Sequence, residues 1–368
     1  HLFNEAYLMH TSTSPQYSII ASCDVAAAMM EPPGGTALVE ESILEALDFR
    51  RAMRQIENDF GKKDWWFKVW GPDKLVEEGM GRAEDWIIRS DSKSKKAGAK
   101  WHGFGQLADG FNMLDPIKST IVTPGLNLDG KFDKTGIPAS IVTKYLAEHG
   151  VVVEKTGLYS FFVMFTIGIT KGRWNTLLTA LQQFKDDYEK NQPMWRILPE
   201  FCQQHKRYER MGLQDLCQHV HEMYAKYDIA RLTTEMYLSD LTPAMKPSDA
   251  YAHIAHRKTD RVEIDELEGR ITVGLVTPYP PGIPLLIPGE VFNKKIVDYL
   301  KFAREFAKLC PGFETDIHGL VEVEDENGQV RYYADCVADE KKGKNPKPLA
   351  TAKNLVQVGG DGPYGRTI

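Results

Sequence analysis

The spacing of hydrophobic positions divides the chain into helices and strands. Helical patterns cover residues 17–30, 38–60, 213–227, 229–237, 249–256 and 294–310, and the one at 38–60 has a clear apolar face. The first of these segments is so rich in Ala and Met that we expect it to be buried. β-branched and aromatic runs predict strands at 64–70, 261–267, 317–323 and 330–337, the last two joined by an Asn-Gly turn.

The most informative pattern lies between residues 119 and 190. Residues 119–125 are β-branched and end in Pro-Gly, which predicts a strand that runs into a turn. A helix follows from Pro138 to Gly150, then strands at 151–155 and 161–167, and then a helix at 171–190. The strand at 161–167 is apolar throughout, so we expect it to be buried on both faces. The order strand–helix–strand–strand–helix predicts a small α+β sheet with helices packed on it.

One acidic residue stands out in this unit. Glu154 ends a strand that otherwise reads Val-Val-Val, and Lys155-Thr-Gly follows it. One interpretation is a carboxylate at the end of a strand that points to solvent, paired with Lys155. The other is a carboxylate aimed into a pocket, where it holds a cation. Alternation along the strand puts Glu154 on the face opposite Val153 and Lys155, which does not decide between the two.

Composition excludes several classes of protein. The chain has 368 residues, of which 42% are hydrophobic and 26% charged, enough for two or more globular domains. A net charge of −6 provides no basic surplus for neutralising phosphates, so we expect no nucleic-acid partner. No apolar run approaches the roughly 20 residues of a membrane helix, and the first 30 residues show no signal-peptide pattern, so we expect no membrane association.

The cysteines indicate a reducing compartment rather than a metal centre. There are five, they are scattered, and none forms a Cys-x-x-Cys pair, which favours a cytoplasmic location. Cys217 and His221 share a helix face with His219 between them, but no second cluster completes a ligand set, so we expect no metal.

A run of hydroxyl residues, Thr11, Ser12, Thr13 and Ser14, precedes Pro15. One interpretation is a turn and helix cap, because Ser and Thr side chains satisfy free N–H groups there. The other is a loop that binds phosphate. The glycine-rich stretch at 359–365 has no strand before it and no helix after it, so we do not interpret it as a phosphate loop.

The residues of several motifs closely resemble those of the bacterial inducible-type ornithine/lysine/arginine decarboxylases. Among them are Val-Val-Val-Glu-Lys-Thr-Gly at 151–157 and Pro-Tyr-Pro-Pro-Gly-Ile-Pro at 278–284. The other matching segments lie at 3–15, 101–104, 114–118, 136–139, 288–290 and 311–319. They follow in one order from His1 to about Val337. Residues 64–67 and 154–160 bring the chain nearest to the lysine and arginine members.

The resemblance implies a fold and a domain arrangement. These enzymes use pyridoxal 5′-phosphate and have the aspartate-aminotransferase fold, so we expect a mixture of α/β and α+β structure. Residues 1–110 would be the end of the cofactor-binding large domain and a connecting segment. Residues 111–192 would be the small α+β domain, 193–338 an α+β C-terminal domain, and 339–368 a disordered tail.

The resemblance also assigns roles to the two candidate sites. Glu154 matches the position that contacts the distal charged group of the basic amino acid substrate. Ser12, with its neighbours Thr11 and Thr13, matches a loop that reaches the cofactor phosphate across a subunit boundary. We therefore expect a homodimer or a higher homo-oligomer with composite active sites, and a substrate that is lysine, then arginine, then ornithine in order of preference.

One departure from the family is large. The lysine that forms the Schiff base follows Ser-x-x-His in the family and precedes the segment at Phe3, and neither it nor the aspartate that pairs the pyridine nitrogen is present here. His205-Lys206 lies in the wrong domain to replace that lysine. We therefore expect the C-terminal part of a decarboxylase, inactive by itself. The alternative is a non-catalytic binding or regulatory subunit related to the enzymes.

Overall fold

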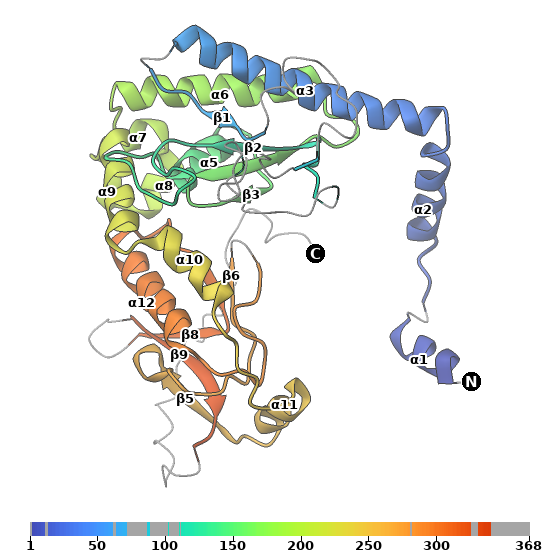
Figure 1. Ribbon diagram of the computed structural model, residues 1–368, viewed down its shortest axis with the longest axis vertical. Helices are drawn as coiled ribbons and strands as arrows, with labels where there is room; N and C mark the ends of the chain where they lie inside the picture. Colours follow the sequence, from blue (N-terminus) through green and yellow to red (C-terminus); the bar gives the residue numbers. More distant parts are fainter. Residues whose placement is uncertain are drawn as a thin grey trace.

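A computed structural model describes residues 2–11, 14–61, 64–71, 87–88, 102, 110, 112–279, 282–324 and 330–339. The long helix α3 (Gly34–Phe60) runs beside α6 (Lys171–Glu189) at the top of Figure 1. Its C-terminal half packs on the rest of the protein through Ala46, Phe49 and Met53. Its N-terminal half leads away to α2 (Tyr17–Met29) and α1 (Leu2–His10), which form an arm at the side of the molecule (Figure 1).

A four-stranded antiparallel sheet forms the centre of the structure. Its strand order is β1-β2-β4-β3, with β3 at one edge. The strands are β1 (Lys68–Val69), β2 (Lys118–Val122), β3 (Lys155–Thr156) and β4 (Ser160–Met164). Helix α5 (Ala139–Glu148) connects β2 to β3, and α6 follows β4. The predicted order strand–helix–strand–strand–helix is therefore confirmed.

Two details of this sheet differ from the prediction. The strand predicted at 151–155 forms a ladder only at Lys155–Thr156, and Val151 at its start bonds instead to the end of α5, where its N–H donates to the carbonyl of Leu146 at 2.9 Å. The prediction that the apolar strand is buried on both faces is also wrong. Phe161 is buried, whereas Phe162 and Met164 on the opposite face are only partly covered. Hydrophobic composition alone does not reveal how completely a neighbour covers each face.

A buried arginine fastens α3 to the sheet. Arg50 donates from Nη1 to the carbonyl of Trp70 at 3.0 Å and from Nη2 to that of Lys118 at 2.9 Å. Burial lowers the pKa of this guanidinium to about 10. Trp66 and Phe67 lie in the adjoining core, so the Trp-rich segment is part of the core.

Short helices carry the chain from the central sheet to the C-terminal region. They are α7 (Met194–Ile197), α8 (Pro199–Gln204), the 3₁₀ helix η2 (Lys206–Tyr208) and the longer α9 (Leu213–Lys226). The first turn of α9 is capped from a distance, because Oδ1 of Asn191 accepts the backbone N–H of Gln214 at 2.8 Å.

The C-terminal region contains two further small sheets. One is antiparallel with the order β5-β9-β8, and the other pairs β6 with β7. The strands are β5 (Thr259–Glu263), β6 (Thr277–Tyr279), β7 (Asp316–His318), β8 (Leu320–Glu324) and β9 (Val330–Val337). The helical elements are α10 (Ile229–Leu238), α11 (Pro247–Ala255), η3 (Ile264–Glu266) and α12 (Lys294–Leu309). Pairing of β8 with β9 confirms the predicted hairpin arms, whereas its Asn-Gly turn lies outside the described residues.

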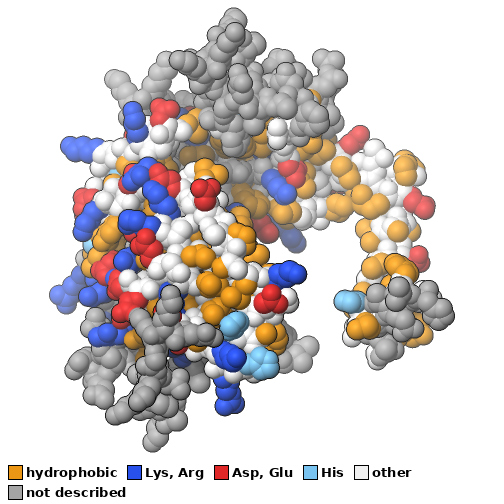
Figure 2. Space-filling model, turned by 60° about the horizontal axis from the view of Figure 1, so that its bottom comes forward, with side chains coloured by type: hydrophobic (Ala, Val, Ile, Leu, Met, Phe, Trp, Pro, Cys, Tyr) orange, Lys and Arg blue, Asp and Glu red, His pale blue; other side chains and the backbone are white. Residues whose placement is uncertain are grey.

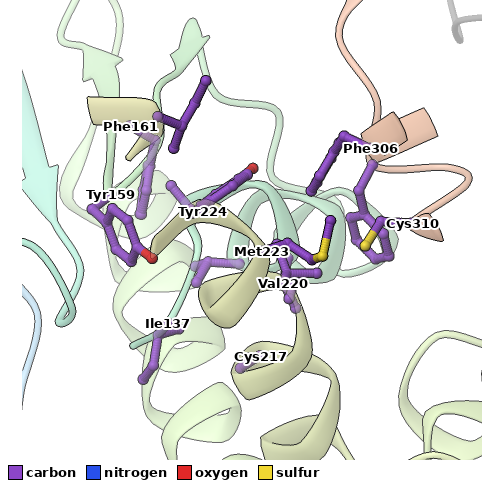
Figure 3. Close-up of a cluster of buried hydrophobic side chains, with 14 of the residues drawn as sticks. Ile137, Tyr159, Phe161, Cys217, Val220, Met223, Tyr224, Phe306 and Cys310 are labelled. Atoms are coloured by element: carbon purple, nitrogen blue, oxygen red, sulfur yellow. The ribbon is translucent and has the colours of Figure 1, made fainter. Parts of the chain in front are cut away.

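One hydrophobic core joins the central sheet to the C-terminal region. Figure 3 shows Phe161 of β4, with Tyr159 just before that strand, beside Tyr224 of α9. The Tyr224 ring stacks on Phe306 of α12, with centroids 5.3 Å apart.

No helix in the described part of the chain is long and apolar enough to cross a membrane. The predicted tail and the glycine-rich stretch at 359–365 lie outside the described residues, apart from Asp339.

Candidate functional site

Glu154 lies at the exposed edge of the central sheet. Its backbone N–H donates to the carbonyl of Phe162 at 3.0 Å, just before β3 begins. The side chain is exposed, and the described residues give it no hydrogen bond or ion pair, with Lys155 or any other residue. The side chain therefore faces solvent, as one of the two interpretations from the sequence has it, but without the pairing to Lys155, and the carboxylate is available to a ligand or to another subunit.

A tight turn follows Glu154 and β3. The N–H of Gly157 donates to the carbonyl of Ser160 at 2.6 Å and closes the turn between β3 and β4. The same turn is held to its neighbours by backbone bonds from Thr123 to Tyr159 and from Ala139 to Leu158, both 2.9 Å. The turn is thus attached to the end of β2 and to the start of α5.

The loop between β2 and α5 covers this turn. It leaves the sheet at Pro124-Gly125 and returns at Gly136, where the N–H of Ile137 donates to the carbonyl of Pro124 at 2.8 Å. The hydroxyl of Thr123 donates to the carbonyl of Ile137 at 2.6 Å. These two bonds close the base of the loop, so its ends are fixed relative to the sheet.

A buried histidine joins the loop, the turn and helix α9. The hydroxyl of Tyr159 lies 2.6 Å from Nδ1 of His221, and Nε2 of His221 lies 2.9 Å from the carbonyl of Asp133. A carbonyl only accepts, so Nε2 carries the proton and Nδ1 accepts from the Tyr159 hydroxyl. Both side chains are buried, and burial raises the pKa of Tyr159 well above its usual value.

Two glycines make room for these rings. A Cβ on Gly136 would lie 2.1 Å from Nδ1 of His221, and a Cβ on Gly125 would lie 2.5 Å from Cε1 of Tyr159. No motif in the sequence pointed to this pair of side chains. The available signal was the two glycines at the ends of one loop, since glycine is favoured where a ring packs directly on the backbone.

Thr11 and Ser14, the two residues of the hydroxyl run that the structure describes, lie on the arm between α1 and α2. Thr11 is exposed and directly follows α1, whereas Ser12 and Thr13 lie outside the described residues. Within this single chain α1 is far from β3, as Figure 1 shows. The structure therefore does not bring Thr11 and Glu154 together.

The arm carries exposed hydrophobic side chains. No residue of α2 is buried, so the prediction that this helix is buried is wrong for the chain taken alone. Figure 2 shows hydrophobic side chains along the arm, where it stands apart from the rest of the molecule. The exposed apolar residues of the arm are Phe3, Tyr7, Met9, Tyr17, Ile19, Ile20, Val25 and Met29. A surface of this kind belongs against another surface.

The remaining sequence candidates belong to the core or to a junction. Cys217 is fully buried, and burial raises the pKa of its thiol well above the usual value, which makes it unreactive. In the described residues no group of three or more His, Cys, Asp and Glu side chains is arranged to hold a metal. His205 packs on the Phe201 ring at 4.7 Å between α8 and η2, so it serves packing.

Comparisons with known proteins place this geometry in a family. Residues 1–173 match the model of the Orn/Lys/Arg decarboxylase major domain, and residues 230–338 match that of the Orn/Lys/Arg decarboxylase C-terminal domain. The chain belongs to the Orn/Lys/Arg decarboxylase family. The recognition made from the sequence motifs is therefore confirmed.

Relatives in this family are similar over nearly the whole chain. The lysine decarboxylase LdcA of Pseudomonas aeruginosa is 46% identical over 341 residues, which cover 92% of this chain and 44% of LdcA. The inducible lysine decarboxylase of Escherichia coli is 39% identical over 92% of this chain and 46% of its own length. A solved structure of lysine decarboxylase A from P. aeruginosa matches with a TM-score of 0.83 over 91% of this chain and 44% of that chain. The chain thus spans less than half the length of these relatives, and its mixed α/β fold is that of lysine decarboxylases.

Proposed function

We propose that this chain is part of a lysine decarboxylase that depends on pyridoxal 5′-phosphate, and that Glu154 recognises the distal ammonium of the substrate. The observation that carries the proposal is the free carboxylate of Glu154 within the Val-Val-Val-Glu-Lys-Thr-Gly motif. Two similar relatives bear the name lysine decarboxylase, which supports lysine before arginine and ornithine. A non-catalytic regulatory role finds no support among these relatives.

Glu154 would select the substrate by charge. A carboxylate that accepts hydrogen bonds from an ammonium group forms one of the stronger polar contacts in proteins. In the single chain this carboxylate is in water, where such a contact contributes little. Coverage by another subunit or by the remainder of the enzyme would exclude water and strengthen the contact. Glu154 would then favour an amino acid with a distal cation over a neutral one.

The hydroxyl run fits the phosphate of the cofactor. The exposed hydroxyl of Thr11, with those of Ser12 and Thr13, would donate hydrogen bonds to phosphate oxygens. When bound, the cofactor ring accepts the electron pair left on the substrate as CO₂ departs. The residues of this chain would bind and orient the cofactor and the substrate. The lysine that attaches the cofactor in the family is not among the motifs of this sequence that match it.

The separation of Thr11 from Glu154 supports a composite active site. The arm places Thr11 away from the sheet beside Glu154 (Figure 1), so one chain alone would not complete the site. We infer a homodimer or a higher homo-oligomer, in which the hydroxyl run of one subunit serves the cofactor of its neighbour.

The five free cysteines are compatible with a reducing cytoplasm.

The first experiment is to read the coding sequence upstream of His1 for Ser-x-x-His-Lys and an aspartate. The protein from the complete reading frame is then assayed for CO₂ release from lysine, arginine and ornithine with the cofactor added. Glu154→Gln should raise the KM for lysine about tenfold or more, the size expected for one charge-assisted hydrogen bond, and leave cofactor absorbance unchanged.

Glu324→Gln is the matched control, because Glu324 is also an exposed carboxylate, at the far end of strand β8. Its kinetics should equal those of the wild type. Absence of CO₂ release from all three amino acids would refute the proposed activity. Unchanged kinetics of Glu154→Gln would remove Glu154 from the site.

A further inference from the structure

Glu154 owes its position to the backbone around it. Its side chain makes no contact that fixes it among the described residues, and β3 behind it is only two residues long at the edge of the sheet. The carboxylate is therefore held as firmly as the β3–β4 turn is held. Whatever fixes that turn also fixes where Glu154 meets a ligand.

Tyr159 is the side chain that anchors this turn. Of residues 154–160, all of them described, only Tyr159 makes a side-chain hydrogen bond to another described residue, and its partner is His221. The remaining attachments of the turn are backbone bonds to Thr123, Ala139 and β4. Gly157 gives the turn backbone freedom, and the hydrogen bond of Tyr159 restrains that freedom.

His221 transmits the restraint to the rest of the fold. It sits on α9, is buried, and bonds at once to the turn through Tyr159 and to the loop through Asp133. Its ring also packs directly on the backbone of Gly136, one residue before the base of the loop closes at Ile137. One imidazole therefore sets the spacing between α9, the loop and the turn that carries Glu154.

We propose that Tyr159 and His221 are positioning residues that place Glu154 for recognition of the distal ammonium. The inference rests on the proposed function, because it acts through Glu154. Loss of the Tyr159 hydroxyl leaves the backbone bonds of the turn intact, so the fold persists while the turn and the carboxylate gain freedom. Binding of the distal cation weakens, and the chemistry at the α-carbon is unaffected.

The test uses Tyr159→Phe in the protein from the complete reading frame. We expect the KM for lysine to rise about fivefold, as for loss of one hydrogen bond, with kcat changed less than about twofold. Norleucine has the lysine chain without the distal amine, so its inhibition constant should stay unchanged. That split between lysine and norleucine separates positioning of Glu154 from general loss of structure.

Tyr208→Phe is the matched control. The Tyr208 hydroxyl is likewise buried and donates to the carbonyl of Pro311 at 3.1 Å, so neither partner belongs to the β3–β4 turn. Both variants lose one buried hydrogen bond and should lower the melting temperature similarly. Only Tyr159→Phe should raise the KM for lysine. An equal rise in both variants, or no rise in Tyr159→Phe, overturns the inference.

A double-mutant cycle links the pair to Glu154. In a Glu154→Gln background, Tyr159→Phe should cause no further rise in the KM for lysine, because the carboxylate that it positions is gone. Additive effects overturn the inference and leave the proposed function standing. If Glu154→Gln itself has no effect, the proposed role of Glu154 fails, and the inference fails with it.

A second pair of variants keeps the test decisive if Tyr159→Phe does not fold. The amide of Asn in His221→Asn reaches the position of Nδ1 and retains an acceptor for the Tyr159 hydroxyl. The amide of Gln in His221→Gln reaches the position of Nε2 and retains the link to Asp133. A KM for lysine near the wild-type value in His221→Asn, together with a raised KM in His221→Gln, supports the inference. A raised KM in His221→Asn with a near wild-type KM in His221→Gln overturns it.

Discussion

The ring of His221 rests directly on the backbone of Gly136. A Cβ at residue 136 would lie 2.1 Å from Nδ1 and 2.6 Å from Cε1 of that ring, closer than atoms approach without displacement. The ring is buried and held at both nitrogens, so it has little room to move. The contact explains why glycine, and no larger residue, suits the position just before Ile137.

Gly136→Ala should therefore destabilise the protein. We expect a loss of about 2 kcal/mol, the usual cost of forcing an extra methyl into a packed interior. Urea unfolding followed by circular dichroism measures it. Gly172→Ala, in the exposed first turn of α6, is the control and should be neutral or slightly stabilising, because its Cβ meets only Thr170 at 3.9 Å. Equal stability of the two variants would contradict the contact.

His205 should make stability depend on pH. Desolvation lowers its pKa below 6.5, opposed by Glu314 and assisted by the nearby Lys144 ammonium. The unfolded chain therefore takes up the proton first as pH falls, and folding stability decreases below about pH 6.5. Above that pH the protonation of His205 no longer reduces folding stability, because His205 is neutral in both the folded and the unfolded state.

Thermal melts of wild type and His205→Gln over pH 5 to 8 check this expectation. Gln does not titrate, so the wild type should lose stability relative to the variant only on the acidic side. A difference in melting temperature that stays constant across the range would show that His205 does not contribute through its pKa.

Lys185 should stabilise the protein mainly through its aliphatic stem. The side chain is 1% exposed, and its ammonium bonds to Asp64 at 3.0 Å and to Glu189, over the rings of Phe60 and Trp65. Both carboxylates remain partly in water, so they tolerate loss of the cation. Lys185→Met should cost less than Lys185→Ala, which leaves a cavity and should lose about 3 kcal/mol. Urea unfolding compares them, and equal losses would show that the charge dominates.

The arm should make the chain self-associate when it is expressed as residues 1–368 alone. Its exposed apolar side chains include Tyr17, Ile20 and Met29 on a helix with no buried residue. We expect binding of the dye ANS and concentration-dependent association in gel filtration. A chain of residues 34–368 should show both to a smaller extent. Equal behaviour of the two chains would mean that the arm is covered by other residues of the same chain.

The sequence predicted the central unit because local rules and the tertiary structure agree there. Pro138 and Gly150 bound α5, and the apolar face of α6 is the one that is buried, against α3, α5 and α9. The prediction failed for the valines at 151–153, since this stretch leaves the end of α5, where the N–H of Val151 bonds to the carbonyl of Leu146 rather than to a strand. It also failed for the burial of α2, because burial needs a partner surface that composition does not supply.

The sequence by itself determined the family, the order of the elements and the selection of Glu154 as a candidate site residue. These depend on the residues of the motifs and on short-range spacing. Only the tertiary structure decided that the Glu154 carboxylate is free and that Thr11 lies far from it. It also decided the link between Tyr159 and His221, which are 62 positions apart in the chain. Contacts over such separations form only when the packing of α9 on the sheet brings the two side chains together, and no local pattern records that packing.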